Sequence, residues 1–119
     1  MKRLMIVDDA AFMRATIKRM LDSHEYEVVA EAPDGSEAVK LYKQYQPDIT
    51  TMDITMPNMT GIEALKAIKL YDANAKIVMV TSMGQESFIR EAIMNGASSF
   101  IVKPFQKEKL LEVLDGITK

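Results

Sequence analysis

The chain has 119 residues, of which 48% are hydrophobic and 27% are charged, and its formal net charge is -2. This length suits one domain with its own buried core, and we expect residues 1–119 to form a single domain with no separate output domain. The small net charge gives no reason to expect nucleic acid or an anionic membrane as a partner, and the absence of cysteine excludes disulfides and thiolate metal sites.

The first apolar run, residues 4–7, ends at two acids, Asp8 and Asp9. The run is far too short for the hydrophobic region of a signal peptide or for a membrane span. We therefore interpret it as a buried strand and expect a cytoplasmic protein.

The stretch after Asp9 has the spacing of a helix. Its apolar residues fall at positions i, i+4, i+7 and i+8, at Met13, Ile17, Met20 and Leu21. His24, the only histidine, lies in a polar stretch at the expected end of this helix, where its charge would favour the helix dipole. The next strand is expected at residues 28–30.

Two capping-box patterns mark the starts of the second and third helices. Asp34 and Glu37 precede the second helix, which should stop before Pro47. Thr60 and Glu63 have the same spacing before the third helix.

Two further apolar runs predict the third and fourth strands. Residues 49–52 lead into Asp53, and residues 77–80 lead into Thr81 and Ser82. An acid that ends a buried strand without starting a helix has little structural purpose, because a buried charge is costly unless it is paired. Asp53 is therefore a candidate functional residue.

The last third of the chain repeats the strand and helix alternation. A helix is indicated by the apolar stripe Phe88, Ile89, Ala92 and Ile93, which ends at Asn95 and Gly96. Residues 100–102 form the last expected strand, directly before Lys103. The final helix carries Leu110, Leu111, Val113, Leu114 and Ile117.

Five strands and five helices in strict alternation predict an α/β fold, a doubly wound five-stranded parallel sheet of flavodoxin-like type. Right-handed crossovers favour the strand order 2-1-3-4-5. In that order the first and third strands are neighbours, and a crevice opens where Asp8, Asp9 and Asp53 end them. Thr81 and Lys103 border the same edge.

Such a cluster of carboxylates is tolerable only with a counter-charge or a shifted protonation state. Mg²⁺ accepts carboxylate oxygens and keeps room for phosphate oxygens, and Lys103 can add a point charge. An aspartate can attack phosphorus and hold an aspartyl phosphate. The residue types therefore suit phosphoryl transfer, with Asp53 as nucleophile, Asp8 and Asp9 for the metal, and Thr81 as a hydroxyl for a phosphoryl oxygen.

The motifs around these residues resemble those of response-regulator receiver domains, from Arg3 to about the end of the chain. They are Val7-Asp8-Asp9, Met52-Asp53-Ile54-Thr55-Met56-Pro57, Gly61, Val80-Thr81-Ser82 and Val102-Lys103-Pro104-Phe105. The resemblance implies that a histidine kinase phosphorylates Asp53. It also implies that Asp9, Asp53 and the backbone carbonyl of Thr55 bind Mg²⁺, with Asp8 acting through water.

The same resemblance implies a switch pair, Thr81 and Phe100, in which the hydroxyl moves toward the phosphoryl group as the ring turns inward. Lys103 would contact a phosphoryl oxygen. Two positions depart from the enteric chemotaxis form of the family. Phe100 lacks a tyrosine hydroxyl, and Thr55 replaces an asparagine at a place where the side chain can influence the attack of water on the phosphoryl group.

The absence of an output domain and the motif details are similar to the stand-alone chemotaxis regulators of this family. That similarity implies a monomer that accepts phosphate from a histidine kinase of the CheA type and binds a flagellar motor switch protein of the FliM type, with a phosphatase as a further partner. It also implies a phosphoacceptor that catalyses only its own phosphotransfer and autodephosphorylation, and not an enzyme.

Several other interpretations stay open. Asp8 and Asp9 could cap a helix, Thr81 and Ser82 could cap another, and Lys103 could be a solvated loop residue. A stand-alone phosphorelay shuttle is the nearest alternative function. A Mg²⁺-dependent phosphatase that passes through an aspartyl phosphate is disfavoured because Thr55 stands where such enzymes place a second acid. Flavin binding is disfavoured because the first loop offers Asp8 and Asp9 where a flavin phosphate needs hydroxyls and amides.

Overall fold

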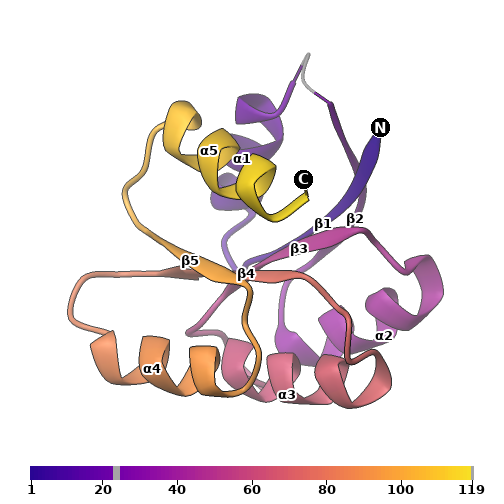
Figure 1. The fold of residues 1–119 in the computed structure, drawn as a ribbon, viewed down its shortest axis with the longest axis vertical. Coiled ribbons are helices and arrows are strands. Elements are labelled where there is room, and N and C mark those ends of the chain that lie inside the picture. Colours follow the sequence, from indigo (N-terminus) through magenta and orange to yellow (C-terminus); the bar gives the residue numbers. More distant parts are fainter. Residues whose placement is uncertain (23–24, 119) are drawn as a thin grey trace.

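A computed structural model describes residues 1–22 and 25–118 of the chain, so His24 lies outside the described residues. Strands and helices alternate as the sequence predicts (Figure 1). Their bounds are β1 Lys2–Val7, α1 Ala11–Met20, β2 Tyr26–Ala32, α2 Gly35–Tyr45, β3 Ile49–Asp53, α3 Gly61–Tyr71, β4 Ile77–Thr81, α4 Glu86–Met94, β5 Ser99–Val102 and α5 Lys107–Thr118. Within the described part of the chain, no helix has the length and apolarity needed to cross a bilayer.

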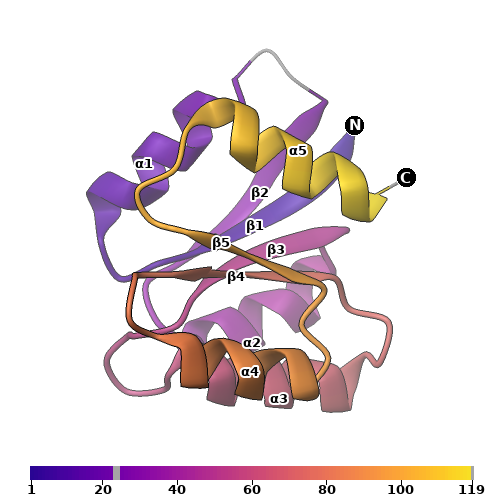
Figure 2. The same ribbon diagram turned by 60° about the vertical axis from the view of Figure 1, so that its left-hand side comes forward.

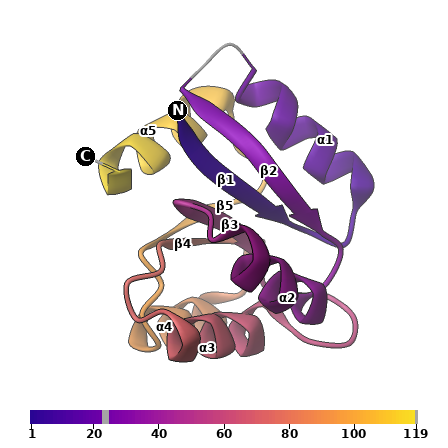
Figure 3. The same ribbon diagram turned by 90° about the vertical axis from the view of Figure 1, so that its right-hand side faces the viewer.

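The five strands form one parallel sheet in the order β2-β1-β3-β4-β5, which confirms the predicted fold class and topology. β1 pairs with β2 on one side and with β3 on the other. Figure 3 shows β1 and β2 lying side by side and pointing the same way. Because the connections leave β1 in opposite directions, the sheet has its switch point between β1 and β3, which is where open α/β sheets form a ligand crevice.

Helices cover both faces of the sheet. α1 and α5 lie on one face, and α2, α3 and α4 lie on the other (Figure 1). Alternate residues of β1 pack into the two resulting cores: Leu4 and Ile6 join Leu110 of α5, whereas Met5 and Val7 join Leu65 of α3. Burial on both faces explains why β1 and β4 contain continuous apolar runs in the sequence.

The predicted capping box is complete at the start of α3, whereas only one of its two hydrogen bonds forms at the start of α2. At α3 the Thr60 hydroxyl accepts from the Glu63 backbone N–H, and the Glu63 carboxylate accepts from the Thr60 N–H, which completes the predicted capping box. At α2 the Asp34 carboxylate accepts from the Glu37 N–H at 2.8 Å, but no return bond from the Glu37 side chain forms among the described residues. The prediction of a full capping box at α2 was therefore wrong, because this helix start has the bond to the Asp34 carboxylate but not the bond to the Glu37 carboxylate.

The α4 helix is exposed over much of its predicted apolar stripe. Ala92 is buried, but Phe88 and Ile93 are 45% and 46% exposed. α4 lies beside the edge of the sheet, under β4 and the short edge strand β5 (Figure 1). The helical period therefore identifies the face of α4 that points toward the sheet. Part of that face stays exposed to solvent because the sheet ends above α4.

Candidate functional site

The candidate site residues meet at the carboxyl ends of the strands. Asp8 directly follows β1, Asp53 and Thr81 are the last residues of β3 and β4, and Lys103 directly follows β5. Figure 2 shows the loops after these strands gathered at the left-hand end of the sheet. The strand order predicted from the sequence places these residues at the same edge.

Three carboxylates form the centre of the site. Asp8, Asp9 and Asp53 each offer an oxygen, and these oxygens lie within 4.8 Å of one another. Asp8 is 1% exposed and Asp53 is 8% exposed, whereas Asp9 faces solvent. The cluster is therefore buried at Asp8 and Asp53 and accessible to solvent at Asp9.

The backbone around the site holds Asp8 in place. Its Oδ1 accepts from the Ala10 N–H at 2.9 Å, and its own carbonyl accepts from Arg14 Nη1 at 2.6 Å. Ala10 is the N-cap residue of α1, and no side chain caps this helix. Helix capping thus does not account for Asp8 and Asp9.

Lys103 reaches into the cluster and bridges two of its acids. The Nζ atom donates to Asp8 Oδ2 at 3.2 Å and to Asp53 Oδ1 at 3.3 Å. Burial alone would lower the pKa of the Lys103 ammonium, but the charges of Asp53 and Asp8 and their hydrogen bonds outweigh burial, so its pKa is raised. The side chain is 26% exposed, which rules out a freely solvated loop lysine. The peptide bond from Lys103 to Pro104 is cis.

The Asp53 carboxyl is the most perturbed acid of the cluster. Its pKa is raised from 3.8 to about 6, first by burial and then by the negative charge of Asp8, while Lys103 opposes the rise. Burial and a nearby like charge both disfavour the ionised form. A cation beside Asp53 would relieve this repulsion.

The loop after Asp53 depends on Gly61. A Cβ atom built on Gly61 would lie 2.0 Å from the backbone oxygen of Asp53, a distance that no side chain tolerates. The Gly61 N–H donates to the Ile54 carbonyl at 2.8 Å. The start of α3 is therefore packed directly against the backbone of the candidate nucleophile.

A glutamine that sequence reasoning missed connects the two threonines of the site. The Thr81 hydroxyl donates to Gln85 Oε1 at 2.6 Å, and Gln85 Nε2 donates to Thr55 Oγ1 at 3.0 Å. Thr81 is buried, and Gln85 is the N-cap residue of α4 without capping it through its side chain. A single glutamine four residues after a strand end carries no signal in the sequence, because only the loop conformation brings its side chain back to Thr81.

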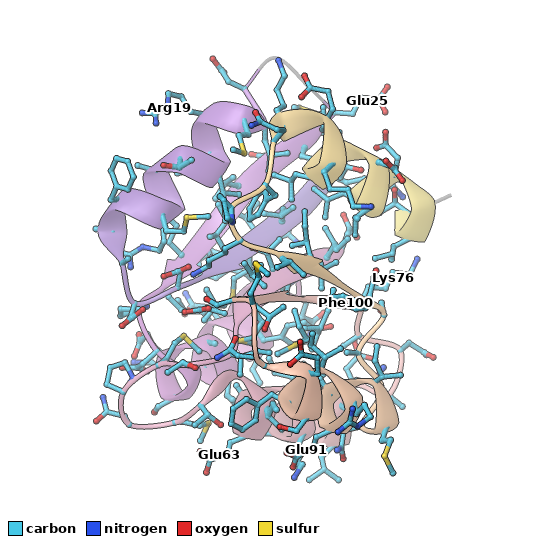
Figure 4. The ribbon with its side chains drawn as sticks, turned by 90° about the vertical axis from the view of Figure 1, so that its left-hand side faces the viewer. Arg19, Glu25, Glu63, Lys76, Glu91 and Phe100 are labelled. Carbon is cyan, nitrogen blue, oxygen red and sulfur yellow. The ribbon has the colours of Figure 1, made fainter. Side chains whose placement is uncertain are left out.

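Phe100 lies on the edge strand of the sheet and is not part of the acidic cluster. It is on β5, and its side chain is 41% exposed. Figure 4 shows Phe100 at the edge of the sheet, below α5 and above the α4 residue Glu91. The Phe100 ring therefore forms part of the exposed surface of β5 and α4.

This donor set fits a hard divalent cation. Carboxylate oxygens are the ligands that Mg²⁺ prefers, and the ion commonly binds through one or two of them while it keeps water and phosphate oxygens. Burial, and after it the negative charge of Asp8, raise the pKa of Asp53, so a cation bound here would favour the ionised carboxylate. The arrangement also provides what phosphoryl transfer needs, which is a carboxylate nucleophile beside positive charge.

The comparisons with known proteins agree with this geometry. Residues 4–115 match the family model described as the response regulator receiver domain. The chain is 56% identical to the chemotaxis protein CheY of Bacillus subtilis, over 95% of this chain and 94% of that protein, and 52% identical to CheY of Thermotoga maritima, over 99% and 98%. The crystal structure of a CheX-CheY-BeF3-Mg²⁺ complex from Borrelia burgdorferi contains a similar chain, with a TM-score of 0.94 and 35% identity, over 99% of this chain and 90% of that one.

Proposed function

The chain belongs to the response-regulator receiver family, and on that premise we propose that it is a phosphorylation-activated signalling protein of the CheY type. In this proposal Asp53 accepts a phosphoryl group from a histidine kinase of the CheA type. The phosphorylated protein then binds a flagellar motor switch protein of the FliM type. The chain acts as a phosphoacceptor that promotes only its own phosphorylation and dephosphorylation, in the cytoplasm.

The single observation that carries the proposal is that the Asp53 carboxylate lies close to two other carboxylates and is hydrogen-bonded to a cation, Lys103. Its oxygens lie close to those of Asp8 and Asp9, and Lys103 donates to it at 3.3 Å. In the reaction, an oxygen of Asp53 forms a bond to phosphorus while the bond from phosphorus to the donor's leaving group breaks. The leaving group departs with the electron pair of that bond.

The residues around Asp53 have distinct roles in this step. Asp9 and Asp53, together with the backbone carbonyl of Thr55, would hold Mg²⁺, and Asp8 would act through water. When bound, the metal supplies positive charge for the phosphoryl oxygens. Lys103 would neutralise charge on a phosphoryl oxygen, and the Thr81 hydroxyl would donate to another.

The output surface in this proposal is formed by α4, β5 and α5. Exposed apolar side chains gather on the first two of these elements: Phe88, Ile93, Met94 and Phe100. Apolar residues at a surface mark places where partners bind. The CheX-CheY complex is a case in which a receiver of this type binds another protein. In this proposal a phosphatase is a further partner of this chain.

Labelling of Asp53 tests the proposal. Incubation with acetyl phosphate and Mg²⁺ should add one phosphoryl group per chain, detected by intact mass spectrometry, and Asp53→Asn should abolish the addition. Chelation of Mg²⁺ with EDTA should reduce labelling in the same way. Equal labelling of the wild-type protein and Asp53→Asn would contradict the proposal.

Binding to the motor switch distinguishes this function from a phosphorelay shuttle. We expect the N-terminal peptide of the switch protein to bind more tightly when the phosphate mimic beryllofluoride and Mg²⁺ are present, as measured by calorimetry. Equal affinity with and without beryllofluoride would favour the shuttle. Turnover of small phosphate esters beyond one equivalent would instead favour a phosphatase.

A further inference from the structure

Gln85 uses both ends of its side-chain amide within the site. Its Oε1 accepts from the Thr81 hydroxyl at 2.6 Å and from the Ser82 backbone N–H at 2.8 Å, and its Nε2 donates to Thr55 Oγ1 at 3.0 Å. The backbone N–H of Ser82 can only donate, so the amide oxygen must face Ser82 and Thr81. The orientation of the amide is therefore determined by its partners.

The bond to Gln85 occupies the one hydrogen of the Thr81 hydroxyl. Thr81 is 1% exposed, so water does not replace a lost partner easily, and an unpaired buried hydroxyl is unfavourable. The alternative acceptor within reach, the Ser82 carbonyl, lies farther away at 3.3 Å. For Thr81 to donate to a phosphoryl oxygen on Asp53, the bond to Gln85 must break.

Gln85 also stands at the start of α4. Its backbone carbonyl accepts from the Ile89 N–H at 3.0 Å, in the first turn of the helix. Its side chain makes no cap bond and points back to Thr81 and Thr55 instead. One residue thus joins the loop after β3, the end of β4 and the N-terminus of α4.

We propose that Gln85 is a positioning residue that holds the Thr81 hydroxyl in the unphosphorylated protein and competes with the phosphoryl group for its hydrogen. Release of Thr81 removes one of the three side-chain hydrogen bonds of Gln85, so the change acts directly on the residue at the start of α4. The proposal rests on the proposed function, because it requires a phosphoryl group on Asp53.

The test measures the affinity for beryllofluoride with Mg²⁺, followed by NMR of the backbone amides of Thr81 and Ser82. In Gln85→Met the side chain keeps its length but loses both hydrogen-bonding groups. We expect this variant to bind beryllofluoride about five- to tenfold more tightly, since one competing hydrogen bond is gone. Gln85→Leu is a second apolar replacement and should behave in the same way.

Two further variants separate positioning from a general structural effect. Ser87→Ala changes an exposed position in the first turn of α4 and leaves the bonds of Gln85 in place, so we expect less than about a twofold change. In a Thr81→Ala background, Gln85→Met should no longer change the affinity, because the bond that it removes is already absent. The resting amide signal of Ser82 should shift in Gln85→Met, since that N–H loses its acceptor.

Unchanged or weaker beryllofluoride binding by both Gln85→Met and Gln85→Leu would overturn the proposal. An equal gain in the Thr81→Ala background would overturn it as well. In either case, Mg²⁺-dependent binding by the wild-type protein that Asp53→Asn abolishes would leave the proposed function intact. A wild-type protein that does not bind beryllofluoride would overturn both.

Discussion

α3 and α4 lie next to each other on the same face of the sheet, yet they are anchored very differently (Figure 1). α3 begins with a complete capping box and buries five of its residues, which are Gly61, Ile62, Ala64, Leu65 and Ile68. α4 has no side-chain cap and buries only Ala92. A salt bridge of 3.1 Å from Lys66 to Glu91 joins the two helices at the surface.

This difference in anchoring separates the candidate phosphorylation site at Asp53 from the helix that would respond to it. α3 packs through Gly61 against the backbone of Asp53, so the candidate nucleophile rests on the firmly held helix. α4 is connected to the site through the polar side chain of Gln85. A helix with few buried contacts needs little free energy to shift, so α4 is the element expected to respond to phosphorylation.

The largest expected effect is on the core contact of α3. Leu65 is fully buried, so Leu65→Ala should lower the free energy of unfolding by about 2–5 kcal/mol through lost burial and a cavity. Urea denaturation followed by circular dichroism measures this loss. A loss below about 1 kcal/mol would mean that α3 is not the firmly held helix.

The next effect concerns the charge of Asp53 in the metal-free protein. The pKa of Asp53 is raised to about 6, so folding favours its protonated form, and the ionised form destabilises the folded protein increasingly as pH rises from about 4 to 6. Asp53→Asn removes this charge and should raise the free energy of unfolding by about 3 kcal/mol at neutral pH.

Denaturation of both proteins in EDTA at several pH values tests this prediction. The advantage of Asp53→Asn should shrink as pH falls from about 6 toward 4, because the wild-type carboxyl then becomes protonated. Mg²⁺ should stabilise the wild-type protein more than Asp53→Asn. An advantage that is absent at neutral pH, or that grows at low pH, would contradict the account.

A smaller effect is expected at the cap of α3. Thr60→Ala removes the hydroxyl that accepts from the Glu63 N–H, and loss of such a cap costs about 1 kcal/mol. The matched control is Ser87→Ala, an exposed position in the first turn of α4, which should change stability by less than about 0.5 kcal/mol. Equal losses in thermal or urea denaturation would remove the distinction between the two helices.

The smallest effect is expected on the exposed face of α4. Ile93 is 46% exposed, so Ile93→Ala should alter the free energy of unfolding by no more than about 0.5 kcal/mol. The same substitution should weaken binding of the motor switch peptide if Ile93 belongs to the output surface. A large loss of stability would show that α4 is packed as firmly as α3.

The sheet and the meeting of the acids followed from the sequence because both depend on simple patterns. Alternating strands and helices restrict the strand order, and the residues that end parallel strands meet at one edge. Asp8, Asp53 and Lys103 could be placed together in this way. The roles assigned to them in binding metal and phosphate remain predictions.

Other features depend on three-dimensional detail that no sequence pattern carries. The bond between Gln85 and Thr81 arises from the loop that returns the glutamine to the end of β4. The exposure of Phe88 arises because α4 lies at the edge of the sheet, and helical periodicity says nothing about how much of a face is covered. At α2 the Asp34 carboxylate caps the helix, but the Glu37 carboxylate does not bond to the Asp34 N–H. The spacing of Asp34 and Glu37 permits that second bond but does not require it.

Hydrogen exchange along the chain, with and without beryllofluoride and Mg²⁺, shows directly whether α4 responds to a phosphate mimic while α3 does not. We predict that exchange changes at the backbone amides of α4 and β5 and stays the same in α3, and that Asp53→Asn shows no change anywhere. Exchange that changes equally in α3 and α4, or that leaves α4 unchanged while the ligand binds, would contradict the account.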